Sequence, residues 1–273
     1  MWKSMAASFY SRDFPYSALA PFIEEYEKRA EVSEQGNPDP QANRACQQWD
    51  SFYERHGSSF FHARGYLLSC FPLLCTLSAE DTVLECGAGN GSNLLCLLQS
   101  TPVRVLAADF SSASLRVLGA LPACAEAVER GRLRLLLWDL AAPPPAPLPS
   151  QPLAILLFFT LSAIPPKEHP AVLRALAAAL PVGGHCCFRD YAYGDAAHLR
   201  APATALLSRQ LHRRGDGTLV FYFKLEELAQ LFESAGFEVL ESDIHTVENI
   251  NRKTGQSMRR AFAHLLAARR PLE

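Results

Sequence analysis

Short apolar runs alternate with amphipathic stretches from Thr82 onward. This alternation predicts consecutive strands separated by helices, which is typical of a parallel sheet with helices on both faces. An unbroken apolar strand near residue 155 is expected to lie centrally, buried on both sides. The predicted strands are Thr82–Cys86, Val103–Ala108, Arg132–Trp138, Leu153–Phe159 and His185–Arg189, and the helices between them include Asn93–Leu98, Ser112–Leu118 and Ala171–Leu180.

The pattern changes after residue 200. We expect a helix from Ala201 that ends near Arg214, then a Gly-Asp-Gly turn and an aromatic run at Val220–Phe223. A helix at Leu225–Ala235 and two strands follow, Phe237–Leu240 and one around Ala261–Leu266. A late strand, a loop and a further strand predict a sheet closed by a hairpin with one antiparallel strand.

Residues 1–75 do not share this regular alternation, so we interpret them as an N-terminal extension to a domain at 76–273. The stretch Phe22–Val32 has the spacing of an amphipathic helix. A turn-rich linker at Gly36–Asn43 follows, and then an aromatic-dense segment, Trp49–Phe71. The first sixty residues hold 6 basic and 9 acidic side chains, which favours a lid or a partner surface over an RNA-binding arm.

Composition and charge narrow the function classes. The 273 residues are 49% hydrophobic and 20% charged, with a net charge of −2, which is ordinary for a globular protein and argues against nucleic-acid binding by bulk charge alone. No apolar run reaches the roughly 18 residues of a membrane span. The eight cysteines include no zinc-type spacing. We therefore expect no metal site, no membrane partner and a cytoplasmic location, with the nucleus or the mitochondrion as alternatives.

The strongest local motif is Val83–Gly91, VLECGAGNG. A buried strand ends at an acidic residue, and Gly87, Gly89 and Gly91 precede a helix, so that a ligand can lie against the backbone. Dinucleotide sites use G-x-G-x-x-G with a phosphate on the helix N-terminus. Here the spacing is G-x-G-x-G and Glu85 would repel a phosphate. The motif therefore favours the cationic cofactor S-adenosylmethionine.

Two more acids follow the next strands. Asp109 ends the second strand, where its carboxylate can accept both ribose hydroxyls, and Asp139 follows the third, where it can accept from the adenine amino group. Each could instead cap a helix. Three acids at the carboxyl edge of three consecutive strands nevertheless predict one ligand site, because open α/β sheets bind ligands there. Phe158, at the end of the fourth strand, is expected to wall that site or to pack in the core.

Several further blocks resemble one family. These are WDSFYERHGSSFF at Trp49–Phe61, FRDY at Phe188–Tyr191 and RGDGTLVFYF at Arg214–Phe223, together with LECGAGNGS and ADFSS. In order from Trp49 to Leu266, they resemble the methyltransferase-like family that forms 3-methylcytidine at position 32 of the tRNA anticodon loop. The resemblance implies a Rossmann-like class I methyltransferase: an α/β fold with a seven-stranded, mostly parallel sheet and a helical, aromatic N-terminal extension.

The resemblance also implies site residues and partners. Trp49 and Tyr53 would close over S-adenosylmethionine, while Arg189 and Asp190 would line the acceptor pocket, with Asp190 stabilising positive charge on the methylated base. tRNA is the expected substrate, and family members can need an accessory protein such as an aminoacyl-tRNA synthetase. One departure is His62–Tyr66, where the family usually has a Lys-Asp-Arg-His-Trp-like run.

The expected chemistry is transfer of a methyl group to N3 of an unpaired or flipped cytosine, which depends mainly on alignment. Two alternatives stay open. A small-molecule methyltransferase of the same fold would have a closed apolar acceptor pocket without basic surface beside it. An inactive cofactor-binding scaffold would be supported by the altered 62–66 segment. Paired arginines after residue 200, such as Arg213–Arg214 and Arg259–Arg260, form a phosphate track if they share a face with Asp190.

Overall fold

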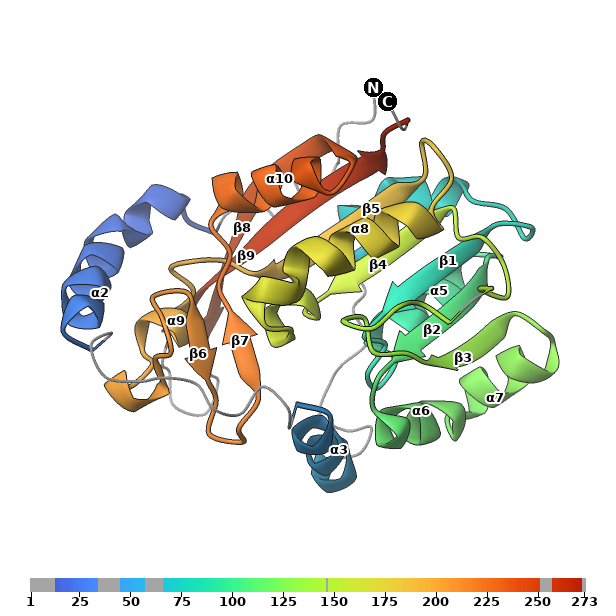
Figure 1. Cartoon of the computed structure of the whole chain (residues 1–273), viewed down its shortest axis with the longest axis horizontal. Coiled ribbons are helices and arrows are strands. Elements are labelled where there is room, and N and C mark those ends of the chain that lie inside the picture. The colour runs from blue at the N-terminus through green and yellow to red at the C-terminus, as the bar shows by residue number, and fades with distance from the viewer. Residues whose placement is uncertain (1–12, 34–44, 57–65, 146, 251–256, 272–273) are drawn as a thin grey trace.

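The computed structural model describes residues 13–33, 45–56, 66–145, 147–250 and 257–271. The predicted linker at 36–43, most of the altered 62–66 segment and the basic pair 252–253 lie outside the described residues. Seven strands form the main sheet in the order β3-β2-β1-β4-β5-β9-β8 (Figure 1). The strands are β1 (Thr82–Cys86), β2 (Arg104–Asp109), β3 (Leu133–Leu137), β4 (Ala154–Phe158), β5 (His185–Tyr191), β8 (Phe237–Ile250) and β9 (Ser257–Arg269).

The sheet confirms the expected architecture. Strands β1 to β5 pair in parallel, and β9 pairs antiparallel with both β5 and β8, so β9 is the single antiparallel strand. All five side chains of β4 are buried, which agrees with its unbroken apolar sequence, and all five of β1 are buried too, Thr82 and Glu85 included. Strands β2 and β3 follow β1 toward one edge of the sheet, and the chain then returns to place β4 on the other side of β1. The loops after β1 and β4 therefore lead away in opposite directions and leave room for a ligand.

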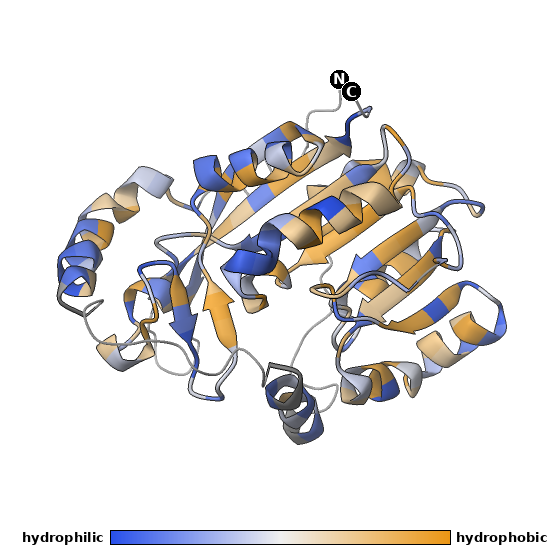
Figure 2. Ribbon diagram, viewed as in Figure 1, coloured by the Kyte–Doolittle hydropathy of each residue, from blue (hydrophilic) through white to orange (hydrophobic). Residues whose placement is uncertain are grey.

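Helices cover both faces of the sheet. Residues of α8 and α10 form one hydrophobic cluster with alternate side chains of β1, β4 and β5, and residues of α4, α5 and α7 form a second cluster with the remaining side chains (Figure 2). No helix in the described ranges is long and apolar enough to cross a bilayer. The helices of the domain are α4 (Leu67–Cys70), α5 (Ser92–Ser100), α6 (Ser112–Gly119), α7 (Pro122–Glu129), α8 (His169–Ala179), α9 (Ala196–Leu199) and α10 (Leu225–Ser234).

The predicted helix ending near Arg214 is wrong. The segment holds a short 3-10 turn (η7, Ala203–Ala205) and a hairpin of β6 (Leu211–Arg213) and β7 (Leu219–Phe221) around the Gly-Asp-Gly turn. His212 is buried between two partly exposed neighbours, so the segment has the period of two of a strand. Strands β8 and β9 are also longer than predicted, because their exposed ends stabilise each other by pairing rather than by apolar burial.

The N-terminal helix α2 (Ala20–Ser33) packs against this hairpin and α9. The Tyr26 hydroxyl donates to the carbonyl of Arg209 at 2.8 Å, so His212 Nε2, 2.9 Å away, must donate to the Tyr26 oxygen. His198 accepts from a backbone N–H at Nδ1 and therefore donates from Nε2 to the same Arg209 carbonyl. Both imidazoles are neutral, and burial lowers the pKa of His198 to about 3 and of His212 to about 4.

Candidate active site

The glycine loop between β1 and α5 has the backbone that its sequence predicts. Gly87, Gly89 and Gly91 have φ angles of 69°, 55° and 83°, which L side chains rarely adopt. A Cβ on Gly87 would lie 2.3 Å from Thr160 Oγ1, and one on Gly89 would lie 2.8 Å from the Tyr53 hydroxyl. The loop is therefore a closely fitted cradle in which backbone groups, and not side chains, face the neighbouring space.

Helix α3 (Ala45–His56) lies against this loop. Asp50 accepts a hydrogen bond from the Ser111 hydroxyl at 2.5 Å, and Ser111 caps the N-terminus of α6 by accepting from a backbone N–H of its first turn. Phe52 and Tyr53 pack on Ala113 of α6. Asp50 thus fastens the aromatic segment to the helix that follows β2, and the Tyr53 hydroxyl lies against Gly89.

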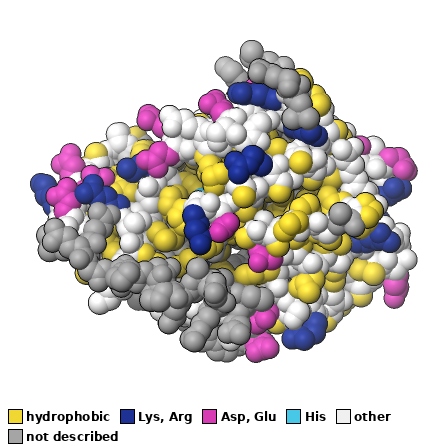
Figure 3. All heavy atoms as spheres, viewed as in Figure 1, with side chains coloured by type: hydrophobic (Ala, Val, Ile, Leu, Met, Phe, Trp, Pro, Cys, Tyr) yellow, Lys and Arg dark blue, Asp and Glu magenta, His cyan; other side chains and the backbone are white. Residues whose placement is uncertain are grey.

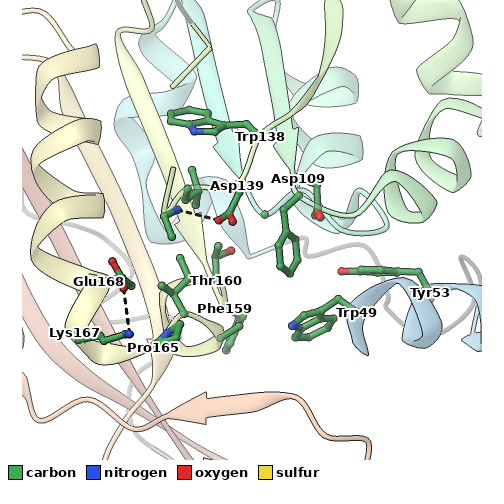
Figure 4. Close-up of a pocket in the computed structure, with 16 residues that line it drawn as sticks. Trp49, Tyr53, Asp109, Trp138, Asp139, Phe159, Thr160, Pro165, Lys167 and Glu168 are labelled. Carbon is green, nitrogen blue, oxygen red and sulfur yellow. Dashed lines mark hydrogen bonds and ion pairs between the residues drawn. The ribbon is translucent and has the colours of Figure 1, made fainter. Parts of the chain in front are cut away.

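A first cavity of about 400 Å³ opens beneath α3, at the carboxyl ends of β1 to β3. Asp109 is buried here and accepts from the N–H groups of Gly89 (2.8 Å) and Ser111 (2.9 Å), and burial raises its pKa. Asp139 is exposed and accepts from the N–H of Ala141 at 3.0 Å. Trp49 and Tyr53 point toward the cavity from α3, opposite Thr160 and Phe159 (Figure 4).

A second cavity of about 310 Å³ adjoins the first, since both are lined by Trp49, Tyr53, Gly87 and Phe159. Glu85 lines its inner end; the side chain is 2% exposed and accepts from Asn93 Nδ2 at 3.1 Å. Asn93 Oδ1 is buried and has no hydrogen-bond partner among the described residues. A carboxylate beside a buried acceptor suits a ligand that carries an ammonium group.

The outer half of the second cavity is aromatic and basic. Phe159 and Tyr191 lie with ring centroids 4.9 Å apart, and the guanidinium groups of Arg214 and Arg260 lie 5.4 and 5.8 Å from the Tyr191 centroid. Arg260 is paired with the buried Asp195 at 2.7 Å. On the viewed face, hydrophobic side chains gather around a hollow that has charged groups near it (Figure 3). These rings and cations can hold a planar base and a phosphate.

Asp190 is fully buried on β5, directly behind this cavity. Its Oδ2 accepts from the N–H of Ser162 at 3.0 Å and its Oδ1 from the N–H of Tyr191 at 2.8 Å. Burial raises the Asp190 pKa to about 6, while the hydrogen bonds from Ser162 and the positive charge of Arg214 act against that rise. Asp190 is not among the residues that line the second cavity, whereas Ser162 is.

Arg189, the preceding residue, points to the opposite face of the sheet. Its Nη1 donates to His245 Nδ1 at 2.9 Å, and its guanidinium lies 5.2 and 4.8 Å from the ring centroids of Tyr66 and Phe262. Polar atoms of Cys70, His245 and His264 lie within 4.8 Å of one another nearby. The rings of the two histidines are stacked at 15°, and His245 Nδ1 accepts the hydrogen bond from Arg189.

The structure therefore gathers most of the sequence-predicted residues at one place. Sequence reasoning missed Asp50, Asn93 and Ser162 as members of the site. Asn93 had a weak signal, since it lies in the first turn of the helix after the glycine loop. Gly91, Arg189 and Asp190 line neither cavity. The other eight of the eleven predicted residues line one or both: Trp49, Tyr53, Glu85, Gly87, Gly89, Asp109, Asp139 and Phe158.

Comparisons with known proteins agree with this geometry. A family profile described as a methyltransferase domain matches residues 60–242. Among solved structures, a SAM-dependent methyltransferase from Anabaena variabilis superposes with a TM-score of 0.63 at 16% identity, covering 87% of this chain and 98% of that one. A SAM-dependent methyltransferase from Methanosarcina mazei gives a TM-score of 0.56 at 18% identity, covering 74% and 99%. These structures establish the fold.

Curated relatives are more specific. The tRNA N(3)-methylcytidine methyltransferase Mettl2 of Drosophila melanogaster is 33% identical over 226 residues, which cover 78% of this chain and 68% of that protein. The human tRNA N(3)-cytidine methyltransferase METTL6 is 32% identical over 229 residues, which cover 80% and 78%. The chain therefore belongs to the tRNA N(3)-methylcytidine methyltransferase family.

Proposed function

We propose that this protein uses S-adenosylmethionine to methylate N3 of a cytidine in tRNA, at position 32 of the anticodon loop. The observation that carries the proposal is the pair of adjoining cavities. One is edged by acids and covered by aromatic rings, and the other ends in aromatic and arginine side chains. Family membership supplies the reaction and the class of acceptor.

The residues present fit the cofactor. Asp109 would bind the ribose hydroxyls, since each of its oxygens accepts one N–H and retains a further lone pair. Asp139 would take the adenine amino group, with Trp49 and Tyr53 against the adenosine. Glu85 and Asn93 Oδ1 would take the ammonium of the methionine part. The cradle at Gly87 and Gly89 leaves room for the ligand but none for a Cβ on either glycine.

When bound, S-adenosylmethionine supplies an electrophilic methyl group on a sulfonium. Phe159 lines both cavities and Phe158 lines the second, and Phe159 would present one face to the acceptor base while excluding water. Tyr191 would stack on the other side of the base. Because N3 lies on the pairing edge, the base must be unpaired, which costs little in a loop.

The arginines of the outer cavity support a nucleic-acid acceptor over a small molecule. A closed apolar acceptor pocket would be expected for a small-molecule enzyme, whereas here Arg214 and Arg260 stand at the cavity and can contact phosphates next to the target base. Asp190 would stabilise the positive charge of the methylated base through its field, and Arg189 would hold β5 in place behind it. A charge of −2 for the whole chain limits intrinsic tRNA affinity.

Accessory binding and location complete the proposal. An aminoacyl-tRNA synthetase or another tRNA-binding protein would supply the missing affinity. We place the activity in the cytoplasm rather than in the nucleus or mitochondrion. All cysteines that the structure describes are unpaired thiols, which suits a reducing compartment. Fractionation of cells that express the chain tests the location directly.

The function is tested by incubating the purified protein with labelled S-adenosylmethionine and total tRNA, with and without cell extract. Digestion to nucleosides should yield labelled 3-methylcytidine, and sequencing should place it at position 32. If neither reaction gives 3-methylcytidine, the proposal is wrong. Asp190→Ala should abolish turnover and leave cofactor binding measured by calorimetry within about threefold; lost binding would move Asp190 into the cofactor site.

A further inference from the structure

Ser162 has a position that neither its sequence nor the proposed function accounts for. It lies in the short 3-10 turn η5 (Leu161–Ala163) after β4, is 2% exposed, and lines the second cavity together with Phe158 and Phe159. It therefore faces the place where the acceptor base and the methyl group would meet. Asp190 lies behind it, away from the cavity.

The contacts between Ser162 and Asp190 fix the direction of the hydroxyl. The Ser162 N–H donates to Asp190 Oδ2 at 3.0 Å, and the Ser162 hydroxyl lies close enough to the same carboxyl group to lower its pKa. An ionised carboxylate only accepts hydrogen bonds, so its negative charge draws the hydrogen of the nearby Ser162 hydroxyl toward Asp190. The remaining lone pairs of Ser162 Oγ are then available as acceptors on the cavity side.

The nearby hydroxyl of Thr160 is oriented differently. Thr160 Oγ1 lies 2.9 Å from the carbonyl oxygen of Cys86 and 3.0 Å from that of Phe158, so its hydroxyl group donates its hydrogen to the main chain. Thr160 also lines the first cavity and not the second. Ser162 is the residue after β4 whose hydroxyl is both aligned by a buried carboxylate and placed at the second cavity.

We propose that Ser162 Oγ, aligned by Asp190, accepts a hydrogen bond from the 4-amino group of the target base and so selects cytidine over uridine. This inference rests on the proposed function. Cytosine presents an amino donor beside an unprotonated N3, whereas uracil presents a carbonyl oxygen beside an N–H. An acceptor whose own hydrogen is held by Asp190 cannot turn to satisfy the uracil oxygen, and it leaves that oxygen desolvated and unpaired.

The same contact favours the reaction itself. The N3 lone pair forms a bond to the methyl carbon as the carbon–sulfur bond breaks, the sulfur keeps that electron pair, and the base leaves as a 3-methylcytidinium cation without losing a proton. Positive charge spreads from N3 to the amino nitrogen, so the hydrogen bond to Ser162 Oγ strengthens as the transition state forms. Such a contact raises kcat more than it lowers KM.

The test compares two tRNAs that differ only at the methylated position. One carries cytidine and the other carries pyrimidin-2-one ribonucleoside, which retains N3 and lacks the 4-amino group. With the cytidine substrate, Ser162→Ala should lower kcat about 10- to 100-fold and change KM little. With the pyrimidinone substrate, wild type and Ser162→Ala should react at equal rates, because the contact is absent in both.

Controls separate this role from a structural one. Ser162→Thr keeps the hydroxyl and should retain activity within about threefold, and Ser234→Ala, at an exposed serine of α10, should match wild type. If Ser162→Ala does not fold, Ser162→Cys, which nearly keeps the shape but accepts poorly, is measured instead. An equal loss on both substrates, or full activity on cytidine, overturns the inference while 3-methylcytidine formation by wild type stands. No product from wild type overturns both proposals.

Discussion

The fit of the glycine loop gives a quantitative prediction. Gly87→Ala should lower the free energy of unfolding through two separable effects. The backbone angle of 69° costs an alanine about 1–2 kcal/mol. The new Cβ would lie 2.3 Å from Thr160 Oγ1 and 2.6 Å from its Cγ2, an overpacking that costs about 1–3 kcal/mol more. The expected total is therefore about 2–5 kcal/mol.

Gly131 offers a matched control. Its φ angle is 68°, nearly that of Gly87, but a Cβ there would have no atom within 4 Å. Gly131→Ala should therefore show the backbone effect alone, about 1–2 kcal/mol. The difference between the two variants measures the steric part, free of the conformational part.

Urea denaturation of both variants in the wild-type and Thr160→Ala backgrounds completes the assay. Thr160→Ala removes the two nearest atoms and leaves Cβ at 3.0 Å, so the excess cost of Gly87→Ala over Gly131→Ala should fall below about 1 kcal/mol. Equal losses for the two glycine variants in the wild-type background would refute the reasoning. An excess that Thr160→Ala does not change would show that the strain lies elsewhere.

Three further predictions concern the lid, the acid stability and the acceptor cavity. Asp50→Ala should weaken binding of S-adenosylhomocysteine severalfold by calorimetry, because it removes the contact that fastens α3 to α6; unchanged affinity would contradict the lid assignment. The pKa values of His198 and His212 are lowered to about 3 and 4 in the folded protein, so as the pH falls these histidines gain protons in the unfolded chain before they do so in the folded one. The free energy of unfolding should therefore fall from pH 6.5 toward pH 4. Asp190, with its pKa raised to about 6, binds its proton more tightly in the folded state and so opposes this fall between about pH 6 and pH 4. Urea titrations are therefore made on Asp190→Asn, in which this opposing effect is absent. A free energy of unfolding that does not change with pH in this variant would contradict the prediction. Arg214→Ala should weaken tRNA binding and reduce the slope of log K against log salt by about one, with cofactor affinity unchanged.

The parallel part of the fold could be predicted because strands that are buried on both faces give short, mostly apolar runs in the sequence. Strand β4 is apolar at every position, β1 is apolar apart from Thr82 and Glu85, and the ends of both strands fall within a residue of the predicted ones. No such pattern marked the hairpin β6–β7 as a pair of strands. His212 is polar yet buried. Its Nε2 is hydrogen-bonded to Tyr26, 186 residues away along the chain, and its ring stacks on that of His198. Local periodicity therefore indicated a helix where tertiary contacts make a strand.

The site shows the same division. Glu85, Gly87 and Asp109 follow strands in a recognisable pattern, so their meeting at one edge of the sheet could be expected. Ser162 and Asp50 had no local signal. Each belongs to the site through a partner far along the chain, 28 residues away for Ser162 and 61 for Asp50. Their roles depend on which loops the sheet brings together, and a single sequence does not record this.

The opposite directions of Arg189 and Asp190 set a limit on sequence change in β5. The two residues carry opposite charges, and register with β9 decides which one stands behind the cavity: Asp190 opposite Ala263, and Arg189 opposite His264. Deleting one residue just before Arg189 would shift the residues after it by one position and turn Asp190 to the opposite face of the sheet, so the carboxylate would no longer stand behind the cavity. Pairing with the C-terminal hairpin, which lines little of the cavities itself, thereby helps to keep a carboxylate and not a guanidinium behind the second cavity.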